Sequence, residues 1–565
     1  YVPIFDAISQ LLSHDQGLIA ADRESVADTF VETAPGLATL IRQSPSSDDL
    51  RTTVAQMFGD DDGGSAEQTR FLDILFDILH AAAMCRPLIV VLEDLHWSDT
   101  GTQQFLRHLS HRLSEAPILL IATYRPEDRS RETDAHMSGV LEAWRDSDCT
   151  RIDLPRLSQA STAHLTRSLF FDTEFRAGFD EYVYRQSQGN PFIAMEVLKL
   201  LRSRHLLLNR NGIWQAEPDF DRAEIPARVE ALVREGLDGL SSAERQLLQL
   251  AAAIGSRFSS ALLEKASGLP RVELLGLLFQ LEKIHRLVIA VDGDYEFSHS
   301  MIREVLYGEL PGELRREYHR LLAGLIADRD WVGEAHTDLG HHLFISEQFA
   351  DALPHLVKAA DEAAHIFSWD EAAAINDDVF AAGRAQSDVE TQITALLKSG
   401  RAYGHLAHYE AATERFQQCR QMAADHGYVL IEAQAIYETG DLELNQGHLD
   451  SAGESFADVT VRLKSLDLQT SWPLYAKALI AWGSVDFEAG RHEQAESRWL
   501  EAQAMLTGDE ADPASTDVAE ASNVVNNLAV LATVRGQFDR AWALYQEALD
   551  LDARRDVSGQ TVLTL

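Results

Sequence analysis

The first 160 residues alternate helical and strand-like hydrophobic patterns. Residues 2–12 and 69–84 carry apolar side chains at i, i+3, i+4 and i+7, the spacing of amphipathic helices. Residues 87–92 (PLIVVL) and 116–123 (APILLIAT) are continuous apolar runs, which are typical of strands buried on both faces of a parallel sheet. The alternation predicts an α/β sheet covered by helices.

Two shorter patterns belong to the same region. Ser98 or Asp99 can cap a helix over residues 100–113, because their side chains accept hydrogen bonds from the free N–H groups of a first turn. Residues 150–158 (TRIDLPRLS) predict a third, shorter strand.

The pattern changes after residue 160. Residues 160–240 are predicted to be helical, and residues 241 to about 330 predict three helices followed by two β-prone runs. Asp292-Gly293 lies between those runs and indicates a tight hairpin turn. Three helices and a hairpin suggest a winged-helix-like domain, for which we favour a structural spacer over a DNA reader.

From about residue 335 the strand signals stop and a turn motif recurs, as in AHYEAA, GHLDSA and GQFDRA. Its closing alanines are Ala352, Ala372, Ala412, Ala452, Ala495 and Ala541. Each motif lies between two helical patterns, which predicts stacked helix pairs forming an α-solenoid. The repeat resembles tetratricopeptide repeats, with a period longer than the usual span of roughly 34 residues. An irregular helical bundle explains the regular turns less well.

Composition and charge limit the functional class. With 565 residues the chain is too long for one core, so two to four domains are expected. The formal net charge of −40 disfavours binding to phosphate backbones, so we expect no direct nucleic acid partner. The three cysteines show no paired spacing, which favours a reduced, cytoplasmic setting. The sequence has no apolar run approaching the roughly 20 residues that span a bilayer, so no membrane partner is expected.

Candidate chemistry lies where the first apolar run ends, at Glu93-Asp94. Mg²⁺ in phosphoryl chemistry prefers hard oxygen ligands on a rigid scaffold. In this interpretation Glu93 holds the metal, and Asp94 orients or deprotonates the attacking water. Thr123 and Arg125 follow the next strand and are expected at the same sheet edge, where a γ-phosphate lies. Apolar strands ending in acids are common, and Arg125 can also be read as a surface residue that opens a loop.

Five segments together carry a family resemblance: LIVVLEDLHWSD, ILLIATYRPED, LPRLS, SQGNPFIAMEVLKLL and YEFSHSMIREVLYGELPGELRREYHRLLAGLI. In this order they resemble the ATPase modules of STAND signal-transduction NTPases. The similarity is to the AAA-type branch that is attached to class III adenylyl cyclases, serine/threonine kinases and large LuxR-type activators. It covers about residues 1–330, and helical repeats are the family's usual C-terminal partner.

The resemblance implies residue roles in the ATPase core. Glu93 and Asp94 match the Walker B acids, and Arg125 matches the sensor arginine after the fourth strand. His96-Trp97 also follows the family pattern and is assigned to packing and site geometry.

Two further matches lie beyond the core. Gly189-Asn190-Pro191 matches the Gly-x-Pro motif, whose proline packs near the adenine. His299 matches a winged-helix histidine that contacts the ADP β-phosphate and locks the closed state. A buried structural histidine is the alternative for His299. ATP or ADP with Mg²⁺ is the implied cofactor set.

One departure from the family pattern is the P-loop. The chain contains no GxxxxGK[ST], and its first lysine is Lys199. The family places the P-loop and two strands upstream of the stretch that matches residues 1–8, so we expect an N-terminal truncation. A degenerate, non-binding ATPase is the alternative. Without the P-loop amides and lysine, this chain is expected to bind ATP weakly or not at all.

The resemblance thus implies an incomplete α/β P-loop NTPase-type sheet followed by all-α structure. The expected segments are an ATPase core (1–160), a helical lid (161–240), a winged-helix-like domain (241–332) and tetratricopeptide-like repeats (333–565).

The expected function is a cytoplasmic, nucleotide-gated signalling switch with slow turnover. Its repeats bind a protein or small-molecule inducer, it self-associates in the ATP state, and its output domain lies outside this chain.

Three alternatives stay open. One is a nucleotide-inert scaffold whose repeats bind proteins. Another is an origin-recognition-like ATPase with a DNA-reading winged helix, which the charge disfavours. A third is metal binding by His336, His341 and His342, for which a solvated helix face is the simpler explanation.

Overall fold

The computed structural model divides into two compact units. The described residues are 1–13, 18–31, 33–43, 45–55, 57, 65–95, 98–124, 140, 144, 149–170, 173–176, 178–211, 213–217, 220, 233–234, 237, 239–291, 293–327, 336–464, 468–507 and 518–555. Unit 1 comprises Tyr1–Cys149, Ala335–Gly340 and Phe349–Leu565. Unit 2 comprises Thr150–Glu334 and His341–Gln348.

Unit 1 begins with helices and two strands. The elements are α1 (Val2–Leu12), α2 (Ala20–Asp28), α3 (Pro35–Arg42), α4 (Ser47–Ala55), α5 (Ser65–Cys85), β1 (Leu88–Leu92), α6 (Thr100–Ser110), a short 3-10 turn (Leu113–Glu115) and β2 (Ile118–Ala122). The helices predicted at 2–12 and 69–84 are confirmed as α1 and α5. Asp99, rather than Ser98, caps α6 by accepting the N–H of Thr102.

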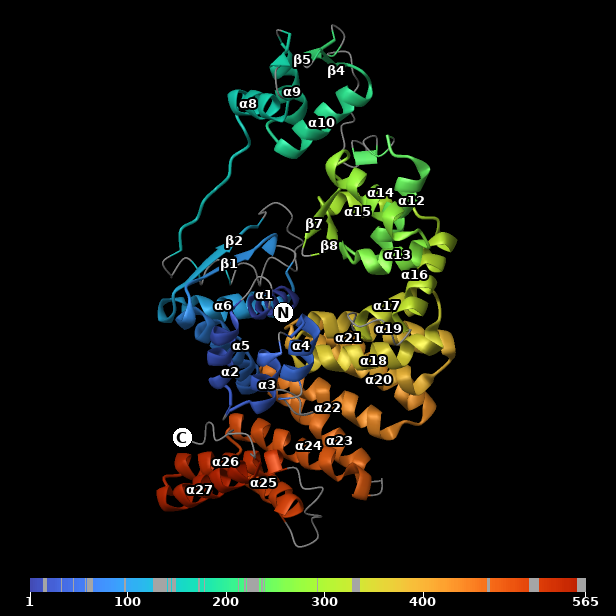
Figure 1. Cartoon of the computed structure of the whole chain (residues 1–565). Coiled ribbons are helices and arrows are strands. Elements are labelled where there is room, and N and C mark those ends of the chain that lie inside the picture. Colours follow the sequence, from blue (N-terminus) through green and yellow to red (C-terminus); the bar gives the residue numbers. More distant parts are fainter. Residues whose placement is uncertain are drawn as a thin grey trace. The chain divides into compact units, whose positions relative to one another are not determined.

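The strands β1 and β2 pair in parallel, with Leu88 opposite Ile118 and Leu92 opposite Ala122. Helices α1, α5 and α6 cover one face of the pair (Figure 1). On the other face Ile89 and Val91 of β1 are 68% and 54% exposed, and Leu119 and Ile121 of β2 are 54% and 44% exposed. The predicted parallel pairing is confirmed, but burial on both faces is wrong for the described residues, whose helices pack on a single face.

The third strand predicted at residues 150–158 is also wrong. This segment is extended but pairs with no strand in the described chain, and Ile152 and Leu154 are 76% and 87% exposed. It belongs to unit 2, where the Leu157 N–H donates to the Gly189 carbonyl at 2.8 Å. Its apolar residues therefore form a strand-like pattern, although no strand among the described residues pairs with it.

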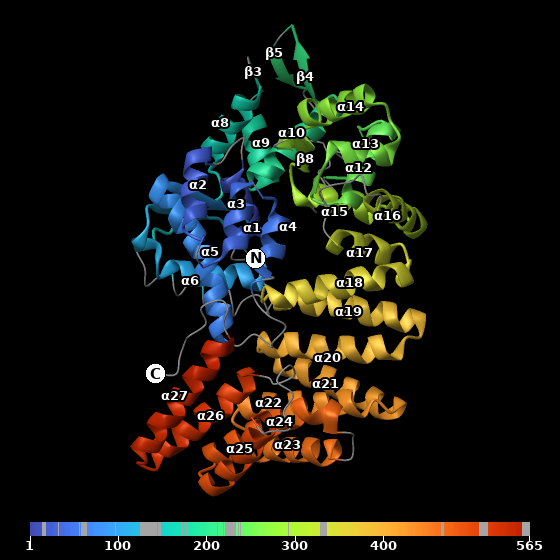
Figure 2. The ribbon, with the colours of Figure 1, turned by 60° about the horizontal axis from the view of Figure 1, so that its bottom comes forward.

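The rest of unit 1 is a series of antiparallel helices, α18–α27, in which each helix packs on the next (Figure 2). The helices are α18 (Phe349–His365), α19 (Trp369–Gln386), α20 (Val389–His405), α21 (Tyr409–His426), α22 (Val429–Asn445), α23 (Leu449–Leu463), α24 (Leu468–Glu488), α25 (His492–Thr507), α26 (Val518–Val534) and α27 (Phe538–Arg555). The predicted α-solenoid is confirmed.

Left-handed residues follow the helices from α17 (His336–Ile345) to α22 at a regular spacing. They occur every 20 residues at Glu347, Phe367, Ser387, Ala407, Gly427 and Gly447. At each, the next N–H bonds back to the carbonyl five residues earlier, as from His448 to Glu443, which is the Schellman ending of a helix. The alanines predicted to close the turn motif are at most 4% exposed, so they allow close helix packing.

Unit 2 contains two groups of elements. The first is α8 (Gln159–Leu169), β3 (Thr173–Glu174), α9 (Phe179–Ser187), α10 (Pro191–Ser203), β4 (Leu207–Arg210) and β5 (Ile213–Ala216). The second is α12 (Ser242–Ile254), β6 (Arg257–Phe258), α13 (Ser260–Ser267), α14 (Arg271–Lys283), β7 (Val288–Val291), β8 (Asp294–Phe297), α15 (Ser300–Gly308) and α16 (Gly312–Ala327). Helix α17 (His336–Ile345) follows.

The hairpin predicted after the three helices is confirmed as β7–β8, with Gly293 at φ +90°. Asp292 lies outside the described residues. The β4–β5 hairpin was not predicted, because residues 160–240 were interpreted as helical throughout. In the part of the chain that is described, no helix is long and apolar enough to cross a bilayer.

The solenoid generates a stability prediction at Gly483 of α24. A Cβ there lies 2.4 Å from the Trp499 indole nitrogen, and Trp499 is fixed because it is 2% exposed and donates to the Ile480 carbonyl at 3.0 Å. We expect Gly483→Ala to cost about 1–3 kcal/mol through overpacking. Thermal unfolding followed by circular dichroism measures the change.

Gly453 of α23 is the matched control, because its added Cβ meets only ordinary contacts at 3.5 Å or more. Gly453→Ala is expected to raise the unfolding midpoint, since alanine is favoured in helices by about 1 kcal/mol over glycine. Equal shifts for the two variants contradict the packing argument.

Candidate functional site

The carboxylate pair Glu93-Asp94 directly follows β1. Glu93 is exposed and Asp94 is half-buried, with a left-handed φ of 52°. The Asp94 N–H donates to the Thr123 hydroxyl at 2.9 Å. Thr123 also donates its N–H to the Leu92 carbonyl at 3.0 Å and accepts the Leu95 N–H at 2.8 Å. Thr123, at the end of β2, therefore takes part in three hydrogen bonds that hold the acidic turn. They fix Asp94 in the left-handed conformation, which aspartate tolerates better than most residues.

The structure places Thr123 beside the acids, as the sequence predicted. Arg125 and His96-Trp97 lie outside the described residues, so their predicted roles remain predictions. In the described chain no group of three or more His, Cys, Asp or Glu side chains forms a metal cluster. A pair of carboxylates nevertheless fits Mg²⁺, which commonly takes one or two carboxylates and completes its octahedron with water and phosphate oxygens.

Helix α6 begins just beyond the acidic turn, and the first helical repeats contact its N-terminus. The Thr100 N–H donates to Asp370 of α19 at 3.0 Å. Arg51 of α4 pairs with Glu371 at 2.9 Å. No sequence pattern indicated these contacts, because residues 51, 100 and 370 come from elements far apart in the chain.

An aromatic contact also joins the strand-bearing region to the first repeats, within the hydrophobic core. The Phe71 ring of α5 meets Phe367, in the turn before α19, edge-on at 5.6 Å between ring centroids. Ile366, Phe367 and Trp369 belong to one buried cluster with the residues of α1–α6. The strand-bearing region and the first repeats therefore share a hydrophobic core.

In unit 2 the motif Gly189-Asn190-Pro191 starts helix α10. Asn190 accepts the N–H groups of Phe192 and Ile193 at 2.9 and 3.3 Å, and Pro191 occupies the first helical position. Gly189 has φ +75°, and a Cβ there lies 2.2 Å from the Leu157 carbonyl oxygen. The motif thus has two structural roles: it begins α10, and its glycine contacts the 150–158 segment.

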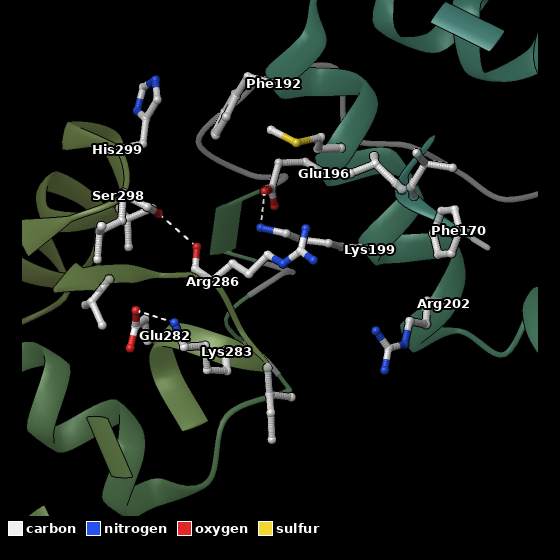
Figure 3. Close-up of a pocket in the computed structure, with 17 residues that line it drawn as sticks. Phe170, Phe192, Glu196, Lys199, Arg202, Glu282, Lys283, Arg286, Ser298 and His299 are labelled. Carbon is white, nitrogen blue, oxygen red and sulfur yellow. Dashed lines mark hydrogen bonds and ion pairs between the residues drawn. The ribbon is translucent and has the colours of Figure 1, made fainter. Parts of the chain in front are cut away.

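His299 lies next to the same motif. It caps α15, and its Nδ1 accepts the Met301 N–H at 3.2 Å, so in the neutral ring the proton resides on Nε2. Its ring stacks on Phe192 with centroids 4.4 Å apart (Figure 3). Unit 2 therefore brings His299 and the Asn190-Pro191 turn together, whereas the Walker B-like acids belong to unit 1.

The predicted solvated histidine face is wrong for His342. This side chain is 3% exposed, and its Nδ1 lies 2.7 Å from Nδ1 of His319, which in turn contacts the Tyr307 hydroxyl at 2.9 Å. Burial lowers the pKa of His342 to about 3 and that of His319 to about 4. Both rings are therefore neutral near pH 7 and hydrogen-bonded within the core, since α17 packs this side against α16.

Comparison with protein families matches the beginning of the chain. Residues 3–121 match the family model of the AAA ATPase domain, which supports the predicted resemblance for the segment that contains β1, α6 and β2. An uncharacterized protein of Rhizobium meliloti (strain 1021) is 26% identical over 254 residues, or 42% of this chain. The alignment spans 22% of that protein's length.

Three solved structures illustrate the limited likeness of this chain to known folds. A Signal Transduction ATPase with Numerous Domains (STAND) protein with a tetratricopeptide repeat sensor, from Pyrococcus horikoshii, is 13% identical (TM-score 0.32; 90% of this chain and 84% of that chain). BtubC of P. vanneervenii is 14% identical (TM-score 0.34; 42% and 92%). The apo quorum sensor NprR of B. thuringiensis is 14% identical (TM-score 0.32; 45% and 72%). The fold assignment rests on the helices and strands of this chain.

Gly189 provides a test of the α10 turn. We expect Gly189→Ala to destabilise the contact with residues 150–158, because the methyl group meets a backbone oxygen that cannot move independently. Hydrogen exchange of peptides covering residues 157–166 and 189–198 should then accelerate. Gly178→Ala is the matched control: φ is +89°, but a Cβ there meets nothing within 4 Å. That variant carries the left-handed penalty of roughly 1–2 kcal/mol without the clash. Equal effects of the two variants contradict the close-approach argument.

Proposed function

We propose that this chain is the regulatory ATPase part of a nucleotide-gated signal-transduction switch of the STAND type, in which the helical repeats sense an inducer. The observation that carries the proposal is the junction between Thr100 at the start of α6 and Asp370 of α19, supported by the Phe71–Phe367 contact. A repeat that changes position on binding a partner acts directly on the helix that follows the acidic turn. The AAA ATPase match of residues 3–121 supports the enzymatic half of the proposal.

At the acidic turn, Glu93 and Asp94 supply the oxygen ligands and the base. Glu93 is exposed at the strand end and would hold Mg²⁺, which would supply positive charge against the developing phosphate charge. Asp94 orients and deprotonates the attacking water, and Thr123 fixes its backbone through the bond to the Asp94 N–H. Arg125 contributes positive charge near the γ-phosphate in this proposal.

In unit 2, His299 and the Gly189-Asn190-Pro191 turn are the proposed nucleotide contacts. Because Nδ1 of His299 accepts a backbone N–H, its Nε2–H is the donor that can face a phosphate oxygen. Pro191 at the start of α10 packs against the base. ADP bound through these residues favours a closed state, and exchange for ATP releases it for self-association.

The chain itself contains no P-loop motif, so we propose that it binds ATP weakly by itself. The output domain is not among its residues, and the inducer is a protein or small molecule at the repeats. A nucleotide-inert, protein-binding scaffold is the competing function. It predicts the same solenoid but no effect of the acids on nucleotide hydrolysis.

The acids provide the first test, in the protein as its gene encodes it in full. We expect Glu93→Gln and Asp94→Asn each to lower ATP hydrolysis about 100-fold, the scale typical of losing a positioned base or metal ligand. Binding of a fluorescent ATP analogue should change much less for Asp94→Asn. Glu115→Gln is the control, since this acid lies between the same strands but pairs with Arg112 at 3.4 Å. Unchanged hydrolysis in both acid variants supports the scaffold.

The junction provides the second test. We expect the rate of amide hydrogen exchange in peptides covering residues 363–373 to differ between the ATP and ADP states. Asp370→Ala should abolish that difference, because it removes the acceptor of the Thr100 N–H. Asp361→Ala is the matched control, because Asp361 pairs with Lys398 within the repeats. A nucleotide-dependent difference that survives in Asp370→Ala contradicts coupling through this contact.

A further inference from the structure

Unit 2 contains an open cavity of about 740 Å³ that none of the sequence patterns indicated. Its walls come from helix α10, the end of α14, strand β7 and His299 (Figure 3). A volume of several hundred Å³ suits a drug-sized molecule. The cavity therefore has the dimensions of a small-ligand site.

Much of the lining is apolar. Phe170 and Phe192 provide two aromatic rings, and the aliphatic side chains are Leu169, Met195, Leu198, Ile284, Val288, Ile289 and Ile302. Phe192 is held in place by its stack on His299, with ring centroids 4.4 Å apart. Such a lining favours a ligand with an apolar body.

The polar lining is cationic. Glu196 pairs with Lys199, and Glu282 pairs with Lys283, each at 2.7 Å. These four charges cancel. Arg202 and Arg286 remain, and neither has a carboxylate partner among the described residues. In a chain with a formal net charge of −40, two uncompensated guanidinium groups at one cavity are a specific feature.

The local structure holds both arginines at the cavity. The Arg202 guanidinium lies 5.5 Å from the Trp214 ring centroid, so an aromatic face supports it. The Arg286 backbone is left-handed at φ 55°, and its carbonyl accepts the Ser298 hydroxyl at 2.9 Å. Figure 3 shows Arg286 reaching across the cavity from the α14–β7 turn and Arg202 on the α10 side.

We propose that this cavity binds a small organic anion with an apolar body, in which the aromatic and aliphatic walls hold the body and Arg202 and Arg286 hold the anionic group. Arginine is suited to this role because its planar fork binds carboxylate, sulfonate or phosphate oxygens through two hydrogen bonds. Because α10 and the α14–β7 turn supply one arginine each, a bound anion bridges the two groups of elements in unit 2. All residues of this site belong to unit 2, and binding to it can be measured without ATP hydrolysis at the acidic turn.

The test uses this chain and the probe anilinonaphthalene sulfonate, an aromatic body with one anionic group. We expect saturable binding with enhanced fluorescence, and an increase in Kd of about tenfold for Arg202→Gln and for Arg286→Gln, the scale of one charge-assisted hydrogen bond. Arg210→Gln is the matched control, because this arginine of β4 pairs with Glu217 at 2.6 Å and does not line the cavity. Unchanged Kd in both cavity variants overturns the proposal.

Two further measurements separate the cavity from other surfaces. Met195→Trp fills the cavity without changing its charges, so it should abolish binding while circular dichroism stays unchanged. Retained binding in that folded variant places the probe elsewhere, such as on the exposed face of β1 and β2, and overturns the proposal.

Competition identifies the ligand class. Displacement by decanoate but not by ADP supports an organic-anion site. Displacement by ADP but not by decanoate overturns that assignment and makes the cavity part of the nucleotide site around His299, an outcome that favours the proposed switch. Loss of hydrolysis in the acid variants is measured independently, so the two proposals can fail separately.

Discussion

Burial of the Phe367 turn in the core of the strand-bearing region is the constraint on which unit 1 depends. Phe367 is 3% exposed although its backbone is left-handed at φ 58°, a conformation that costs a non-glycine residue roughly 1–2 kcal/mol. Its ring contacts Phe71 on one side and Trp369 on the other, at 5.6 and 6.0 Å between centroids. Apolar burial of large aromatic rings offsets that cost, so the turn joins the repeats to α5 rather than merely connecting two helices.

From that anchored turn, the repeats extend by a simple geometric rule. Helices α17 to α22 each end at a left-handed residue, and the N–H that follows it bonds back five residues. A buried alanine lies in the first turn of α18, α19, α21, α23, α25 and α27, where it lets the neighbouring helix approach closely. Pairs such as Gly483 with Trp499 and Gly440 with Phe456 show how glycine on one helix accommodates a ring on its neighbour. Each repeat therefore contacts mainly its neighbours, and a displacement at one end can be transmitted along the stack.

The charge distribution separates three kinds of polar site. At the acidic turn, carboxylates stand at a strand end, where their negative charge suits a divalent cation. At the unit 2 cavity, paired glutamates and lysines cancel and two arginines remain, where positive charge suits an anion. The buried pair His319–His342 is a third type, because burial lowers the pKa of both rings and keeps them uncharged. The first two can recognise charged ligands, whereas the third contributes to packing.

The sequence by itself determined what depends on local periodicity. Helices α1, α5 and α6, the parallel strands β1 and β2, the β7–β8 hairpin and the solenoid all follow from hydrophobic spacing and turn residues. It also located Glu93-Asp94 at the end of an apolar run, whereas the Asn190-Pro191 turn was identified through the family resemblance. Only the tertiary structure showed that residues 150–158 have no partner strand among the described residues, that one face of β1 and β2 is exposed, and that His342 is buried. The Thr100–Asp370 contact and the arginine-lined cavity were likewise invisible, because they join residues from separate elements, and periodicity carries no information about which distant surfaces meet.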